Sequence, residues 1–204
     1  MNKLSSIIWC SVYCFIFGTL LSWFTGVESE FLKLPYPRTI WLYIAPALLA
    51  VTLICLLAEY KPSFKLVKPD SILDYILLII IVAMSSYIIG IIIPNSDTTN
   101  ILQSSKAISK YNSIYTVILN RVTIGLIGPF VEEILYRGII FKTLNKNMSW
   151  ISSTIISSLL FALMHGNLQQ AVFCFILGVA CCYVNKGKDS LWLGYVLHAI
   201  NNCL

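Results

Sequence analysis

Long apolar runs separated by short polar segments dominate the sequence. Their lengths predict seven helices that span a membrane, with boundaries good to a few residues. The predicted spans are Leu4–Phe24, Ile40–Leu57, Tyr75–Ile93, Val122–Leu144, Trp150–His165, Leu168–Val184 and Leu191–Leu204. Segments rich in Pro, Ser, Asn and Lys, such as LPYPR and KPSFKLVKPD, separate the earlier runs. The pattern therefore predicts an all-α, polytopic transmembrane helical bundle of about seven spans.

The composition agrees with a protein embedded in lipid. Of the 204 residues, 58% are hydrophobic and 11% are charged, and the mean hydropathy is +0.82. Soluble domains carry about 25% charged residues, so a separate soluble domain is not expected. The formal charge of +5 comes from basic residues that cluster in particular loops, which favours a membrane surface over a nucleic acid as partner.

The distribution of basic residues predicts the orientation, because cytoplasmic loops carry an excess of Lys and Arg. With a cytoplasmic N-terminus, the inner segments hold nine basic residues and the outer segments four. The inner ones are Lys3, Lys61, Lys65, Lys68, Arg137, Lys142, Lys146, Lys186 and Lys188, and the outer ones are Lys33, Arg38, Lys106 and Lys110. The N-terminus is therefore predicted to be cytoplasmic.

A few ionisable side chains lie at lipid depth in this pattern. Of nine acidic residues, only Glu132 and Glu133 fall inside a predicted span, and both histidines, His165 and His198, fall within or at the end of one. A charged side chain at the centre of a bilayer costs about 3 kcal/mol on insertion scales and usually has a function. Structural hydrogen bonds between helices are the alternative, but Asn, Ser and Thr would form them without burying a carboxylate.

The spacing around one turn places two of these groups side by side. Glu133 lies 15 residues before Met148, in the turn between two spans, and His165 lies 17 residues after it. At a rise of 1.5 Å per residue, both lie about 22–26 Å from the turn. The two side chains are therefore predicted to lie at nearly the same depth.

A third helix brings further polar groups to this layer. His198 and Asn202 lie about 16 and 22 Å from the turn at Lys186–Lys188, which is predicted on the same membrane face. His198 and Asn202 are an i,i+4 pair, as are Glu133 and Arg137, so each pair shares a helix face. Arg137 is positioned to hold one carboxylate ionised, and two adjacent carboxylates in a low dielectric should not both ionise freely. Such an arrangement suits a general base that takes a proton from water.

A proline precedes the glutamates. Pro129 has no N–H, so it is predicted to free the carbonyl of Gly125 and to kink the helix one turn before the carboxylates.

These residues form three motifs in a fixed order. The segment PFVEEILYRG resembles the motif E-E-x-x-x-R, FALMH resembles F-x-x-x-H through Phe161 and His165, and HAINN resembles H-x-x-x-N through His198 and Asn202. In this the chain resembles the CAAX protease and bacteriocin-processing (CPBP, or Abi) family, which includes the type II CAAX prenyl endopeptidases. The resemblance implies a catalytic core in residues 113–204, preceded by N-terminal transmembrane spans in residues 1–112.

The resemblance also implies an activity, that of an intramembrane glutamic endopeptidase. One of Glu132 and Glu133, in our interpretation the first, would activate the attacking water with help from His165. His198 and Asn202 would donate hydrogen bonds to the oxyanion of the tetrahedral intermediate.

The resemblance implies supporting roles and partners as well. Arg137 would position the glutamates, and Phe161 would pack one turn from His165. The expected surroundings are the cytoplasmic membrane of a bacterial cell. The expected substrate is a membrane-associated peptide, such as a bacteriocin or peptide-pheromone precursor or a CAAX-like protein. No cofactor, metal or nucleic acid is expected.

Three other functions stay open on the sequence. A zinc metalloprotease would need at least two His and one Glu as ligands, although neither HExxH nor a CxxC pattern occurs. A self-immunity protein would bind a bacteriocin or its receptor without catalysis. A proton-coupled transporter using Glu132 is less favoured, because no internal repeat is visible.

Overall fold

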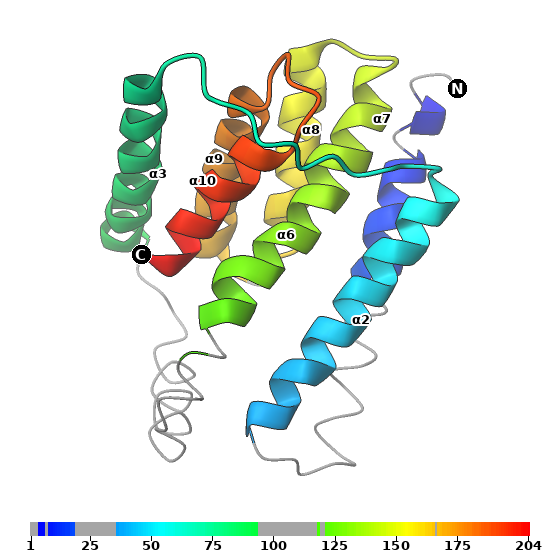
Figure 1. The fold of residues 1–204 in the computed structure, drawn as a ribbon, viewed down its shortest axis with the longest axis horizontal. Coiled ribbons are helices and arrows are strands. Elements are labelled where there is room, and N and C mark those ends of the chain that lie inside the picture. The colour runs from blue at the N-terminus through cyan, green and yellow to red at the C-terminus, as the bar shows by residue number, and fades with distance from the viewer. Residues whose placement is uncertain (1–3, 7, 19–35, 94–117, 119–120, 166) are drawn as a thin grey trace.

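The computed structural model describes residues 4–6, 8–18, 36–93, 118, 121–165 and 167–204 (Figure 1). Every regular element within these residues is helical, which confirms the predicted all-α class. Residues 4–6 and 8–18 are helical, and five further helices are α2 (Tyr36–Leu57), α3 (Ile72–Ile92), α8 (Trp150–Leu163), α9 (Leu168–Val184) and α10 (Trp192–Cys203). The predicted domain boundary at residue 112 lies outside the described residues.

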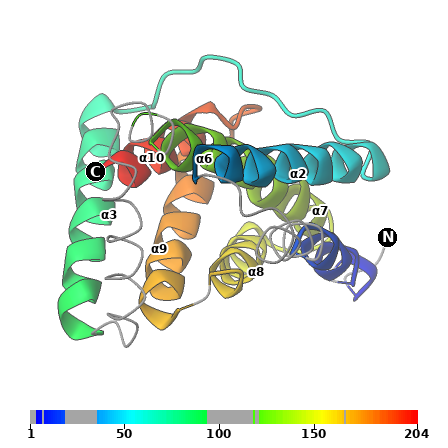
Figure 2. The same ribbon diagram turned by 90° about the horizontal axis from the view of Figure 1, so that it is seen from below.

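A helical rod from residue 121 to residue 145 forms the centre of the bundle. Its consecutive segments are the π-helix η1 (Thr123–Ile127), α6 (Gly128–Glu133), the π-helix η2 (Ile134–Ile140) and α7 (Phe141–Asn145). In Figures 1 and 2, α6 lies between α2 and α10, and both helices contact it. Helices α8 and α9 form an antiparallel pair, and α3 packs on the far side of α9.

Pro129 affects the hydrogen bonding of the first π-helix. The Gly128 N–H bonds to the carbonyl of Thr123, five residues earlier. In this wider register the next carbonyl, that of Ile124, would pair with residue 129, which is proline and has no N–H. The side chain of Asn202 supplies the missing donor, with Nδ2 3.1 Å from the Ile124 oxygen. The Ile124 carbonyl therefore takes a side-chain donor at the position where Pro129 offers no N–H.

The second π-helix carries Arg137 through the most buried part of the rod. All seven of its residues are buried. Ser157 on α8 donates from Oγ to the carbonyl of Tyr136 at 2.7 Å, and this oxygen also accepts the Phe141 N–H, so α8 is tied to the π-helix by a second donor to one backbone oxygen. Short π-helical turns inside α-helices often occur at functional sites.

The predicted helices are confirmed in position, whereas seven membrane spans are not. Among the described residues, α3 is the one helix long and apolar enough to cross a membrane, with a hydropathy of 2.6 and 11% of its most apolar stretch buried. The 14 residues of α8 extend about 21 Å, shorter than a hydrocarbon core of about 30 Å. Outward-facing side chains such as Ile80, Ile91 and Leu159 are nevertheless exposed and apolar, as on proteins embedded in lipid.

The loop after α2, the α7–α8 turn and the α9–α10 turn lie together (Figure 1), as expected for segments predicted to share one membrane face. The loop after α2 crosses the end of the bundle that carries the α7–α8 and α9–α10 turns (Figure 1). It is held there by hydrogen bonds from the Leu191 N–H to the Ser63 carbonyl, at 2.8 Å, and from Ser190 Oγ to the Lys65 carbonyl, at 2.7 Å. We call this end the basic end, because the loop after α2, α7 with the turn after it, and the α9–α10 turn also contain Lys61, Lys68, Lys142, Lys146, Lys186 and Lys188.

Candidate active site

The predicted pair of Glu133 and Arg137 forms a buried ion pair inside the rod. Arg137 Nη1 lies 3.1 Å from Glu133 Oε1, and the two side chains are 2% and 0% exposed. Phe161 on α8 covers the guanidinium, with its ring centre 4.5 Å from Arg137 Cζ. A charge this deeply buried needs such a partner, because an unpaired ion would pay the full cost of leaving water.

His198 on α10 lies between the two carboxylates. Its Nδ1 atom is 3.1 Å from Glu133 Oε1, and its Nε2 atom is 3.5 Å from Glu132 Oε2. A neutral imidazole has one N–H, so His198 can donate to both carboxylates only as the imidazolium ion. The histidine therefore links Glu132 to the ion pair behind it.

The two glutamates differ in their access to other molecules. The side chain of Glu132 is 28% exposed, whereas that of Glu133 is fully buried. Neighbouring residues on a helix point about 100° apart, so one faces the interior while the other faces the edge of the site. Glu132 is therefore the carboxylate that a water molecule or substrate can reach.

His165 lies close to Glu132 at the end of α8. The two side chains are near enough to interact electrostatically. His165 Nδ1 is 2.9 Å from the carbonyl oxygen of Phe161, and because a carbonyl only accepts, the proton must be on Nδ1. In the neutral ring, Nε2 is then left with a free lone pair that can accept a proton.

Phe161 lies between these groups and packs against both histidines. It is fully buried, and its ring meets those of His165 and His198 edge to face, with centroids 4.9 and 5.6 Å apart. Asn202 lies one turn beyond His198, where it caps the Ile124 carbonyl described above. The structure thus brings Glu132, Glu133, His165 and His198 to one layer and places Asn202 at its edge.

Two residues that shape the site, Asn185 and Gly194, belong to none of the patterns found in the sequence. Asn185, at the end of α9, accepts a hydrogen bond from the Gly194 N–H through Oδ1, at 3.0 Å. A Cβ on Gly194 would lie 3.0 Å from Glu133 Oε2 and even closer to Asn185 Nδ2. The missing side chain of Gly194 therefore lets α10 approach both residues, which spacing along the chain cannot reveal.

All of these side chains fall in a segment with known relatives. Residues 114–204 match the Rce1-like family, described as Type II CAAX prenyl endopeptidase Rce1-like. Over these residues, the chain resembles the CAAX protease family. The resemblance drawn from the three motifs is confirmed.

Two relatives show how far the likeness extends. YdiL of Bacillus subtilis (strain 168), which bears the name of a proposed membrane peptidase, is 26% identical over 89 residues, covering 44% of this chain and 36% of YdiL. The membrane-embedded CAAX protease MroQ of Staphylococcus aureus (strain USA300) is 29% identical over 85 residues, covering 39% of this chain and 34% of MroQ. The matched part thus spans about a third of each relative. No solved structure shows a significant match.

The side chains of the site that come closest to a metal-ligand set are one glutamate, one cysteine and one histidine, all of which are ligand types for zinc. Atoms of Glu133, Cys181 and His198 lie within 4.8 Å of one another, and among the described residues His165 is outside this group. The guanidinium of Arg137, 3.1 Å from the Glu133 carboxylate, would repel a second cation. Arg137 would therefore compete with a metal ion for the Glu133 carboxylate.

Replacing Gly194 by alanine is expected to disturb the candidate active site by crowding Asn185 and Glu133. The new methyl group would overlap Asn185 and press on Glu133, and overpacking of this kind costs about 1–3 kcal/mol. Thermal unfolding of the purified protein in detergent measures the loss. Gly128→Ala is the matched control, because its Cβ would meet Thr123 O at an ordinary 3.5 Å. Equal unfolding temperatures for the two variants would contradict the tight fit.

Proposed function

We propose that the protein is an intramembrane endopeptidase in which Glu132 activates the water that hydrolyses a peptide bond. The observation that carries this proposal is the difference between the two carboxylates. Glu132 is partly exposed between two histidines, whereas Glu133 is buried and paired with Arg137. A general base needs such an accessible carboxylate within reach of other proton-carrying groups.

In the proposed reaction, the Glu132 carboxylate takes a proton from water as the water oxygen attacks the scissile carbonyl. The oxyanion that forms accepts hydrogen bonds from His198 and Asn202, and one such donor contributes about 3–4 kcal/mol in proteases. The C–N bond then breaks, and Glu132 passes the proton that it took from water to the leaving nitrogen. His165 is the proton acceptor beside Glu132. Glu133 and Arg137 hold His198 in place and do not exchange atoms with the substrate.

The proposed substrate is a peptide with a hydrophobic segment that reaches the site from the bilayer. A bacteriocin or peptide-pheromone precursor has this character, as does a CAAX-like membrane protein. We place the chain in the cytoplasmic membrane of a bacterial cell, crossing it several times with the N-terminus inside. The basic end of the bundle supports this orientation, since cytoplasmic segments are enriched in Lys.

Peptide profiles of cells test the proposal. Membrane and secreted peptides are compared between cells that express the wild type and cells that express Glu132→Ala at matched levels. Asp70→Asn, which removes a 93% exposed carboxylate, serves as the control. We expect a peptide that matures with the wild type and the control but not with Glu132→Ala. Identical profiles, with bacteriocin protection retained by Glu132→Ala and His165→Ala, would instead favour an immunity protein.

A further inference from the structure

The turn between α9 and α10 separates two cavities at the basic end of the bundle. Lys186 and Lys188 line both of them, and Gly187 between these lysines has a φ of +71°, which a residue without a side chain adopts easily. One cavity, of about 290 Å³, lies toward α3. The other, of about 350 Å³, lies toward α7 and α8 and reaches Arg137.

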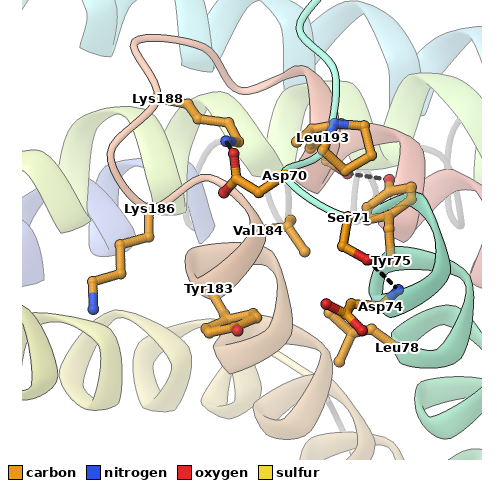
Figure 3. A pocket seen from close by; sticks show the side chains of 11 residues that line it. Asp70, Ser71, Asp74, Tyr75, Leu78, Tyr183, Val184, Lys186, Lys188 and Leu193 are labelled. Carbon is orange, nitrogen blue, oxygen red and sulfur yellow. Dashed lines mark hydrogen bonds and ion pairs between the residues drawn. The ribbon is translucent and has the colours of Figure 1, made fainter.

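The cavity toward α3 is balanced in charge. Asp70 and Asp74 line it together with the two lysines, and Lys188 Nζ binds Asp70 Oδ1 at 2.8 Å (Figure 3). Ser71 is also engaged there, since its hydroxyl accepts the Asp74 N–H (Figure 3). An anion would meet two carboxylates in this cavity, so it is not an anion site.

The second cavity is lined by four cations and one carboxylate, and we call it the basic cavity. It is lined by Arg137, Lys142, Asn185, Lys186 and Lys188, and Asp189 is its one acidic lining residue. That carboxylate lies 3.4 Å from Lys142 Nζ. Three of the cations already have a carboxylate partner, Arg137 in Glu133, Lys142 in Asp189 and Lys188 in Asp70, so among the described residues Lys186 is the unpaired charge. Lys186 Nζ lies 4.6 Å from the centre of the Trp150 ring.

Unused hydrogen-bond donors add to this surplus of charge. Arg137 Nε and Nη2 and Asn185 Nδ2 are buried, and none of the three has a hydrogen-bond partner among the described residues. Arg137 is 2% exposed, so water on the outer surface cannot satisfy it. Buried donors without acceptors cost about 1–3 kcal/mol each. Glu133 Oε2 and Ser158 Oγ, two buried acceptors that also lack partners among the described residues, lie near them, so it is the lysines of the cavity that an anion would meet first.

The location of the basic cavity narrows the choice of anion. It opens at the end of the bundle that carries most of the described lysines, beside the indole of Trp150. Trp is enriched where the hydrocarbon meets the headgroups, and basic pockets between helices on the cytoplasmic side bind anionic lipid headgroups. A volume of about 350 Å³ is large enough for a phosphodiester headgroup.

We propose that the basic cavity binds the phosphate group of an anionic phospholipid. Lys142 and Lys186 attract the headgroup at the mouth, and Arg137 lies behind it in the lining of the cavity. Because Arg137 also holds Glu133, an occupied cavity would stiffen the support of the candidate active site. Lipid binding itself does not depend on the proposed proteolysis.

Native mass spectrometry of the full chain in detergent tests this site. The protein is incubated with phosphatidylglycerol, with phosphatidylcholine or with inorganic phosphate, and bound adducts are counted. We expect phosphatidylglycerol to bind in preference to phosphatidylcholine. The double variant Lys142→Gln/Lys186→Gln should bind phosphatidylglycerol about tenfold more weakly. Lys146→Gln, an exposed lysine on the α7–α8 turn that does not line the cavity, should behave as the wild type.

Each result has a defined meaning. Equal binding of the two lipids, or undiminished phosphatidylglycerol binding by the double variant, overturns the proposal. Equal weakening in Lys146→Gln overturns it as well, because binding would then follow the overall charge of the surface. If inorganic phosphate at the same concentration displaces phosphatidylglycerol from the wild type, the ligand is free phosphate and the lipid assignment is wrong.

Discussion

Replacing Glu132 by glutamine is expected to reduce peptide hydrolysis by about 10²–10⁴-fold, the usual contribution of a general base. Glutamine has nearly the same shape but cannot take a proton from water. The fold should tolerate the change, because Glu132 is 28% exposed and its nearest ionic contact, to His198 Nε2, is 3.5 Å long. The measurement is the initial cleavage rate of a hydrophobic peptide by protein reconstituted into vesicles, followed by mass spectrometry.

Two further variants show whether the loss is one of chemistry. Glu132→Asp keeps a carboxylate on a shorter side chain and should retain part of the activity. Glu132→Gln should unfold at the same temperature as the wild type. A rate within a factor of a few of the wild type for Glu132→Gln would mean that the general base is another group.

Replacing Arg137 by methionine is expected to cause the largest loss of stability. Methionine approximates the length of the side chain but leaves Glu133 as a buried charge without its cation, at a cost of about 3–5 kcal/mol. Activity should also fall, because His198 shares the same Glu133 oxygen at 3.1 Å. Denaturant or thermal unfolding in detergent measures the change in stability.

The control is a surface ion pair at the basic end of the bundle. Lys142 and Asp189 are 39% and 80% exposed, and such pairs contribute about 0–1 kcal/mol, so Lys142→Met should have little effect. The double variant Glu133→Gln/Arg137→Met should recover much of the lost stability, because it removes both charges. If Arg137→Met is no worse than Lys142→Met, the ion pair does not stabilise the core as described.

The common depth of the site residues could be predicted from the sequence, because each residue of a helix adds the same rise along its axis. The spacing of Glu133 and His165 from one turn, and of His198 from the next, placed all three in one layer, where the structure has them. The i,i+4 rule likewise gave the Glu133–Arg137 contact. These inferences need only regular helical geometry and two short turns.

Features that depend on local departures from regular helices could not be predicted. The change to π-helical register before Pro129, and the hydrogen bond of Asn202 to the Ile124 carbonyl, have no counterpart in the spacing of the sequence. The contacts of Asn185 and Gly194 depend on how closely two helices approach, which one sequence does not encode in its spacing. The number of membrane spans, predicted from the length of the apolar runs, stays a prediction, because among the described residues α3 alone is long and apolar enough to cross a membrane.

The most direct test of the central claim, a glutamate-activated water, is cleavage by metal-free protein. Wild-type protein is stripped with a chelator, reconstituted into vesicles and given the hydrophobic peptide, with and without added Zn²⁺. We expect the stripped protein to cleave at the rate of the untreated protein, and Zn²⁺ to have no stimulating effect. Loss of cleavage on chelation and its return with Zn²⁺ would contradict the account and assign the chemistry to a metal at Glu133, Cys181 and His198.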